Sequence, residues 1–182
     1  MREFDRLGFL DINWKDYSFQ CHVAAARACQ PLVTVARDIE HASQVERVID
    51  QAYELLDYAE QVVVVPKCTR LKSKLDEAIP TEFLLGYSVP TKYGGTRIPP
   101  RYFDRPVHLL GGRPDVQREL AKQMQVVSFD CNRFTLDAAF GDYFDGSRFK
   151  PHPEGGYDRC LRESLRNINR IWKSYKGRRG DE

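Results

Sequence analysis

The most constraining feature of this chain is a short apolar run that ends in a charged residue and recurs along the sequence. These runs are Gly8 to Asp11, Leu32 to Asp38, Val62 to Lys67, and the stretch Met124 to Asn132, which holds Asp130. Continuous Val, Ile, Leu and Phe runs are typical of parallel strands buried on both faces. In α/β folds, ionisable groups at the C-terminal ends of successive strands build the reactive site. The pattern therefore predicts an α/β protein with its functional groups at strand ends.

The rest of the sequence predicts helices between these strands. Strands are expected over 8–12, 32–36, 62–65, 83–87, 107–110 and within 124–132, and helices over 17–30, 43–59, 71–78, 115–123, 134–139 and 157–175. The helix over 43–59 rests on apolar residues at helical spacing. A long loop that contains Pro and Gly is expected over 88–105. Loops of this length in a compact domain are usually functional. Residues 141–156 are expected to be irregular.

Chain length limits the architecture that these elements can build. Strands separated by about 20 to 30 residues and one helix are what right-handed βαβ units require. A full (β/α)₈ barrel has about 250 residues, with a lower bound near 200, and this chain has 182. We expect a single α/β domain over residues 1–182, a reduced or incomplete TIM-type (β/α) barrel with parallel strands and a basic C-terminal helix and tail. An open doubly wound sheet is the alternative.

Composition bounds the partners and the compartment. The net charge is only +2, but Arg159 to Arg179 carries eight basic residues against Glu163, so this segment is a candidate for phosphate contacts. The five cysteines are scattered and lack a CxxC pair, which argues against a four-ligand zinc site and favours reduced thiols in a cytoplasmic protein. No apolar run reaches membrane-spanning length. We expect no metal, no cofactor and no membrane partner, with a homodimer retained as an alternative to a monomer.

Charged and flexible residues follow nearly every predicted strand. Parallel strands would bring to one rim Asp11, Asp38, Lys67, Tyr87, Gly111 and Asp130. Paired carboxylates suit displacement at a sugar C1′, where one attacks and the other moves the proton. Gly111 and Gly112 would let backbone come close to a planar base or a phosphate. An Asp after a strand is also a common turn or helix-capping residue, so each one alone has a structural alternative.

Two of the late strands carry a resemblance. Arg105-Pro106-Val107-His108-Leu109-Leu110-Gly111-Gly112, followed after one helix by Ser128-Phe129-Asp130-Cys131, resembles the strand-helix-strand near the end of tRNA-guanine transglycosylases. That family carries an R-P-x-x-L-x-G stretch and then F-D-C, whose Asp is the nucleophile. Upstream, Asp11 stands where the family has its acid/base Asp, Asp38 where an Asp recognises the base, and Phe83 to Tyr87 where a glycine-containing strand lines the base pocket. The resemblance covers residues 8 to 146.

The departures from the family pattern are specific. Asp11 is followed by Ile12-Asn13-Trp14 in place of Ser-Gly-Gly, and the family's zinc-binding C-x-C-x-x-C segment is absent. The basic stretch that follows F-D-C is reduced to Arg133. The chain is therefore more similar to small zinc-less relatives of phages and bacteria that place 7-deazaguanine in DNA than to a tRNA enzyme.

The resemblance implies a base-exchange enzyme acting on guanine in nucleic acid, DNA preferred over tRNA, with a 7-deazaguanine base as the second substrate. It implies Asp130 as nucleophile, Asp11 as acid/base, and Asp38 on the purine edge. Other implied substrate contacts are Asn13, Lys67, Gly86, Tyr87, Gly111, Gly112 and Arg133. The target base must leave the stack, and Trp14, Tyr87 or Tyr93 are candidates to stack on it.

Other interpretations remain beside this one. A non-catalytic nucleic-acid-binding subunit would keep the fold, and a nucleoside or nucleotide N-glycoside hydrolase would use water in place of the incoming base. Lys67 is also a candidate Schiff-base lysine, and Cys131 a candidate nucleophile, although a buried cysteine is expected there. His108 is expected to be a core histidine, and the three other histidines show no ligand spacing.

Overall fold

The fold is described from a computed structural model that covers residues 8–92 and 94–175. The chain divides into two compact units: Met1–Tyr87 with Gly95–Phe103, and Ser88–Gly94 with Asp104–Glu182. The chain therefore crosses three times from one unit to the other. The single domain expected from the sequence stays a prediction.

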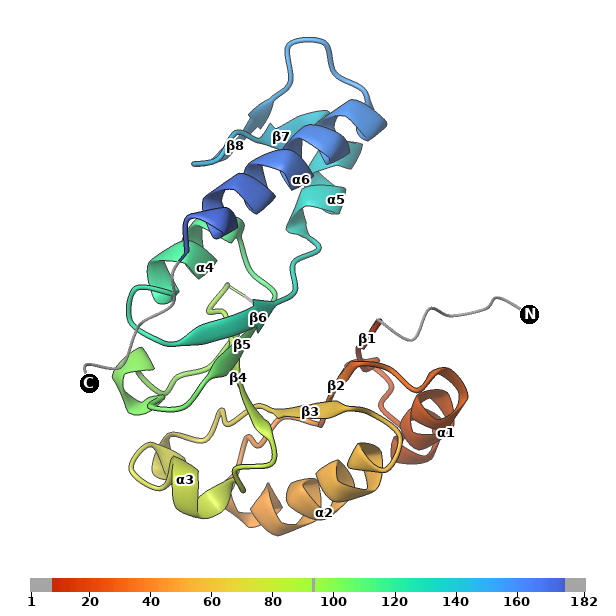
Figure 1. Cartoon of the computed structure of the whole chain (residues 1–182), viewed down its shortest axis with the longest axis vertical. Coiled ribbons are helices and arrows are strands. Elements are labelled where there is room, and N and C mark those ends of the chain that lie inside the picture. Colours follow the sequence, from red (N-terminus) through yellow and green to blue (C-terminus); the bar gives the residue numbers. More distant parts are fainter. Residues whose placement is uncertain (1–7, 93, 176–182) are drawn as a thin grey trace. The chain divides into compact units, whose positions relative to one another are not determined.

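Unit 1 is built around parallel strands. Its strands are β1 (Phe9–Leu10), β2 (Val33–Val35), β3 (Gln61–Val64) and β4 (Leu84–Ser88), whose last residue belongs to unit 2; its helices are α1 (Phe19–Cys29), α2 (Val45–Leu56) and α3 (Leu75–Ala78). Short 3-10 helices cover Ala42–Gln44, Thr69–Leu71 and Pro100–Tyr102. The strands pair in chain order, β1 with β2, β2 with β3 and β3 with β4, all parallel. Helices α1 and α2 contact each other, and α2 contacts β3 (Figure 1).

Local sequence explains the elements of unit 1. Val62 to Val65 are fully buried, as expected of a parallel strand covered on both faces. In α2, Val48, Ala52 and Leu55 share one buried stripe at helical spacing. Ser18 caps the N-terminus of helix α1, where its Oγ accepts the N–H of Cys21 at 3.4 Å. At the other end, the left-handed Gln30 caps the helix just before Pro31.

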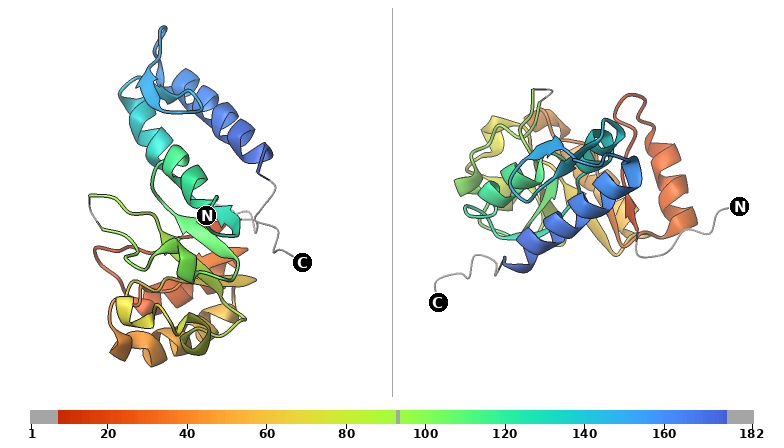
Figure 2. Two further views of the ribbon diagram at one scale, coloured as in Figure 1. Left: turned by 90° about the vertical axis from the view of Figure 1, so that its left-hand side faces the viewer. Right: turned by 90° about the horizontal axis from the view of Figure 1, so that it is seen from above.

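Unit 2 combines a parallel strand pair with a helical layer. Its elements are β5 (Val107–Leu110), α4 (Pro114–Leu120), β6 (Val126–Phe129), α5 (Arg133–Ala139), β7 (Asp142–Phe144), β8 (Phe149–Pro151) and α6 (Tyr157–Lys173). Strands β5 and β6 are parallel, and β7 and β8 form an antiparallel hairpin. Helix α6 lies along α5 and the hairpin (Figure 2). The buried Phe144 fixes it there, because its N–H donates to Ser164 Oγ at 2.9 Å and its carbonyl accepts Asn167 Nδ2 at 2.8 Å.

The predictions for α/β class, parallel strands and intervening helices are confirmed in both units. The prediction that 141–156 is irregular is wrong, since this segment contains the β7–β8 hairpin. Each strand has only three residues, which is too short for an alternation of apolar and polar residues to be recognised in the sequence. The turn depends instead on the Asp145 carboxylate, which accepts the N–H groups of Ser147 and Arg148 at 2.9 and 3.0 Å, and on Gly146 with φ +106°.

Candidate active site

In unit 2, the Asp130 carboxylate stands directly after strand β6. Its Oδ1 accepts the backbone N–H of Gly111 at 3.1 Å and lies 3.3 Å from His108 Nε2. The Asp130 side chain is 34% exposed, whereas that of His108 is 3% exposed. The carboxylate is therefore oriented from its buried side while solvent reaches it from the other. Such pre-orientation is what a nucleophile at a strand end requires.

His108 connects this carboxylate to the neighbouring strand. Its Nδ1 lies 2.8 Å from Ser128 Oγ, so the ring bridges Ser128 and Asp130. An ionised carboxylate only accepts, so Nε2 is the donor to Asp130, and in the neutral ring Nδ1 then accepts from the Ser128 hydroxyl. The expected core histidine is thus buried and hydrogen-bonded, and it also supports the candidate nucleophile.

A fully buried amide holds the two strand ends together. Gln117 Nε2, on α4, donates to the carbonyl oxygens of Gly111 at 2.8 Å and Asp130 at 2.7 Å. Strand β6 also carries an irregularity: Val107 pairs with Val126, but His108 pairs with Ser128. The extra residue, Val127, is 54% exposed. This shift places Ser128 beside His108.

Both glycines after β5 adopt left-handed backbone conformations, with φ +63° at Gly111 and +83° at Gly112. A Cβ at Gly111 would meet open space, whereas a Cβ at Gly112 would lie 2.7 Å from Val89 Cβ. The backbone at Gly112 therefore lies against Val89. The approach of a base or a phosphate to these two glycines stays a prediction.

We expect Gly112→Ala to lower the free energy of unfolding by about 3 kcal/mol, because it adds steric overlap to a strained φ. Gly111→Ala is the matched control and should cost only about 1 kcal/mol, since φ alone is unfavourable there. Urea denaturation of both variants measures this difference. Equal midpoints for the two variants would contradict the assigned contact.

Unit 1 brings together a second set of strand-end residues. Asp38, after β2, is 6% exposed and forms an ion pair with Lys67, after β3. The Lys67 Nζ also lies 5.6 Å from the ring centroid of Trp14, a residue that is 49% exposed. The exposed Asp11 accepts the N–H of Ile12 at 2.8 Å through Oδ1.

Burial is the main influence on the pKa of the Asp38 carboxyl. Desolvation raises the pKa of Asp38 to about 6, against the opposing hydrogen bond and positive charge of Lys67, and the negative charges of Glu40 and Asp11 raise it further. Asp38 and Asp11 are therefore close enough to interact. A carboxyl that titrates near neutral pH can both donate to and accept from a purine edge.

Other residues predicted for the site have mixed surroundings. Gly86 and Tyr87 lie inside β4 and are buried, and Tyr87 packs edge-to-face on Phe103 at 5.1 Å between ring centroids. The exposed Asn13 accepts the N–H of Lys15 at 3.2 Å. Arg133 forms a two-point ion pair with Asp137, with N···O distances of 2.6 and 2.7 Å. Their roles toward a substrate stay predictions.

The cysteines, metal prediction and remaining aromatic candidate are also informative. Cys131 is half-buried, and burial is the main factor that raises the pKa of its thiol, which disfavours a nucleophilic role. All five cysteines are free thiols. In the part of the chain that the structure describes, no group of three His, Cys, Asp or Glu residues could hold a metal ion. Tyr93, one of the predicted stacking residues, lies outside the described residues.

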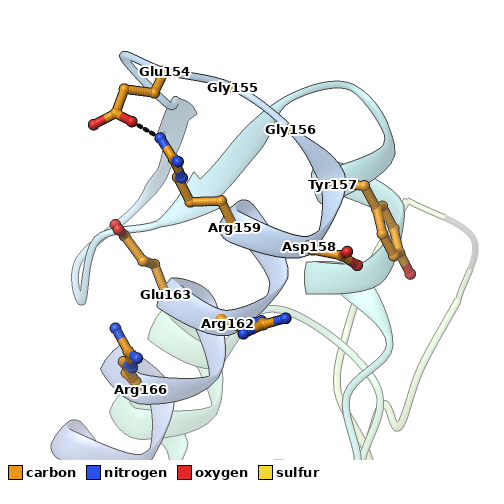
Figure 3. Close-up of a pocket in the computed structure, with 9 residues that line it drawn as sticks. All are labelled: Glu154, Gly155, Gly156, Tyr157, Asp158, Arg159, Arg162, Glu163 and Arg166. Atoms are coloured by element: carbon orange, nitrogen blue, oxygen red, sulfur yellow. Dashed lines mark ion pairs between the residues drawn. The ribbon is translucent and has the colours of Figure 1, made fainter.

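The predicted basic segment corresponds largely to α6. Figure 3 shows Arg159, Arg162 and Arg166 on successive turns of this helix. These residues line a surface hollow of about 1000 Å³. Arg159 pairs with Glu154, while Arg162 and Arg166 are exposed. The opposite side of the helix buries Cys160, Ser164 and Ile168. The basic residues beyond Tyr175 lie outside the described residues.

The fold and the strand-end groups define an α/β protein with parallel strands and polar sites at their C-terminal ends. No described helix has the length and apolar character needed to cross a membrane. Residues 2–173 match the model of DUF6610, a family of unknown function, and the chain belongs to that family. The comparison with curated proteins finds no match.

Sequence reasoning missed several members of these groups. His108 was expected only as a core residue, and Gln117 was not singled out, although both contact the ends of β5 and β6. The helical position of Gln117 carries no distinctive local signal. For His108, the available signal was its position within a strand that precedes the two glycines.

Proposed function

We propose that this protein is a transglycosylase that replaces guanine by a 7-deazaguanine in nucleic acid, with DNA preferred over tRNA. The observation that carries the proposal is Asp130, which follows β6, is partly exposed, and is held by Gly111 N–H and His108. The F-D-C sequence around it resembles that of the transglycosylases. Asp38 is buried beside Lys67 and has a pKa of about 6, so it can accept or donate a hydrogen bond, which supports recognition of a polar purine edge.

In the proposed reaction, an oxygen of Asp130 forms a bond to C1′ and the C1′–N9 bond breaks, so its electron pair leaves with guanine. Asp11, to which the resemblance assigns the acid/base role, gives a proton to the departing base. A 7-deazaguanine then loses a proton to Asp11 and attacks C1′, and the bond between C1′ and the aspartyl oxygen breaks. Both carboxyl groups return to their initial states, and no cofactor is consumed.

We further propose that the fold is an incomplete (β/α) barrel. The pairing of β1, β2, β3 and β4 in chain order supports this, because successive right-handed crossovers wind in one direction. A doubly wound sheet requires a reversal of strand order.

Mass spectrometry of nucleosides tests the activity. The protein is incubated with guanine-containing DNA, or with tRNA in parallel, and a 7-deazaguanine base. We expect the deazaguanine nucleoside to appear in DNA as free guanine is released. Guanine release without incorporation would replace the proposal by N-glycoside hydrolysis. If neither product forms and the protein still binds the nucleic acid, the proposal is replaced by that of a non-catalytic nucleic-acid-binding subunit.

The α6 arginines give a separate prediction about the nucleic-acid partner. Arg162→Gln with Arg166→Gln should make the negative slope of log affinity against log salt shallower by about 2, since each phosphate contact contributes roughly 0.9 to its magnitude. Arg47→Gln with Lys74→Gln removes two exposed cations from unit 1 and serves as the control. Fluorescence anisotropy of a labelled duplex measures both slopes, and equal slopes would remove α6 from the interface.

A further inference from the structure

A polar pocket of about 490 Å³ in unit 1 takes no part in the proposed bond-forming and bond-breaking steps, although Lys67, beside Asp38, is part of its lining. Its walls are the loops that follow β2 and β3, with Arg97 from the segment after β4. The two loops are fixed to each other, because Ile39 bridges Pro66 and the Ile39 carbonyl accepts the N–H groups of Lys67 and Cys68, each at 2.9 Å. The pocket is therefore held by backbone hydrogen bonds at the C-terminal ends of parallel strands, where α/β proteins bind phosphorylated ligands.

The lining is rich in groups that bind anions. Arg70 and Arg97 are exposed, and neither forms an ion pair within the described residues. Ser43 and Thr69 contribute hydroxyl groups. Lys67 also lines the pocket while it pairs with Asp38.

The opposing charges are few. Glu40 is the acidic residue of the lining, and His41 and Cys68 are its other titratable groups. The positive charge of the two guanidinium groups therefore exceeds the negative charge of the single lining carboxylate, even if Lys67 is counted as neutralised by Asp38.

We infer that this pocket binds a phosphate group. Guanidinium groups and hydroxyls together match the several oxygens of phosphate better than one carboxylate. The volume exceeds that of a lone phosphate, so a larger phosphorylated group fits. The same phosphate chemistry can come from a nucleic-acid backbone or from a free nucleotide. This inference deepens the proposed function, on which it rests only for the identity of that ligand.

Titration of the full chain tests the site with three probes: inorganic phosphate, deoxyguanosine monophosphate, and a single-stranded oligonucleotide without a terminal phosphate. Deoxyguanosine is the unphosphorylated reference. Arg70→Gln with Arg97→Gln should weaken the binding of phosphorylated probes by about tenfold or more, because two charge-assisted contacts are removed. Glu40→Gln should strengthen it by about threefold, since a like charge is removed from the lining.

Lys122→Gln with Arg148→Gln removes two exposed cations of unit 2 and should leave phosphate and monophosphate affinity unchanged. Pocket-dependent binding of the monophosphate alone identifies a free nucleotide, and pocket-dependent binding of the oligonucleotide identifies a backbone phosphate. The inference is overturned if no phosphorylated probe binds, or if the arginine variant binds as the wild type does. If phosphorylated probes bind in the pocket but no base exchange occurs, the proposed function is rejected and the phosphate site stands. If base exchange occurs but no probe binds in the pocket, the phosphate site is rejected and the proposed function stands.

Discussion

Asp130→Asn is expected to reduce base exchange by about four orders of magnitude or more, because the carboxamide cannot form the glycosyl bond that the proposed reaction needs. The fold should survive, since the amide oxygen still accepts the Gly111 N–H that now binds Oδ1. Nucleoside mass spectrometry measures turnover, and anisotropy measures whether nucleic acid remains bound. Binding should change little.

Cys131→Ala is the matched control, one residue further along the chain. Its thiol donates to the Gly112 carbonyl, with an S···O distance of 3.2 Å, and its raised pKa disfavours the thiolate. Turnover should therefore persist in this variant. Full activity of Asp130→Asn, or loss of activity only in Cys131→Ala, would assign the nucleophile elsewhere. A stable protein adduct with the sugar, found at Asp130 by peptide mass spectrometry, would identify the intermediate directly.

The second large effect concerns the buried ion pair of unit 1. Lys67→Met should lower the free energy of unfolding at pH 8 by about 3 to 5 kcal/mol, because it leaves the Asp38 carboxylate buried without its partner. Loss of Lys67 also removes the interaction that opposes burial, so the pKa of Asp38 should rise above its present value of about 6. The variant should recover most of its stability at pH 5, where Asp38 is protonated.

The unfolding free energy of the wild-type protein should also fall as pH rises, but by less than in Lys67→Met. The pKa of Asp38 is higher in the folded state than the ordinary value of 3.8, so the folded state binds this proton more tightly. Its contribution is fully present below pH 3.8 and is lost as pH rises through about 6. The rise in the pKa of Asp38 from 3.8 to about 6 corresponds to about 3 kcal/mol of folding stability.

Asp38→Asn combined with Lys67→Met supplies the control, because neither remaining side chain titrates in this range. Its pH profile of stability should lack the component due to this pair. Urea denaturation from pH 4 to 8 compares all three proteins. A Lys67→Met profile parallel to that of the wild type would show that Lys67 does not compensate the Asp38 charge.

The secondary structure was predictable because its signals are local. The apolar run at Val62 to Val65 indicates a strand buried on both faces, and the helical spacing of Val48, Ala52 and Leu55 indicates the buried stripe of α2. The β7–β8 hairpin was not predicted, since its strands have three residues each and its turn is organised by the side chain of Asp145 and the backbone of Gly146.

The sequence by itself determined that Asp11 and Asp130 would directly follow strands, because buried apolar runs end where polar residues begin. Only the tertiary structure decided which groups hold the carboxylates of Asp130 and Asp38. His108 reaches Asp130 across 22 positions in the chain because β6 carries one extra residue against β5. Lys67 meets Asp38 because β2 and β3 are neighbours in parallel register. Such contacts depend on strand register and loop geometry, which spacing along the chain does not encode.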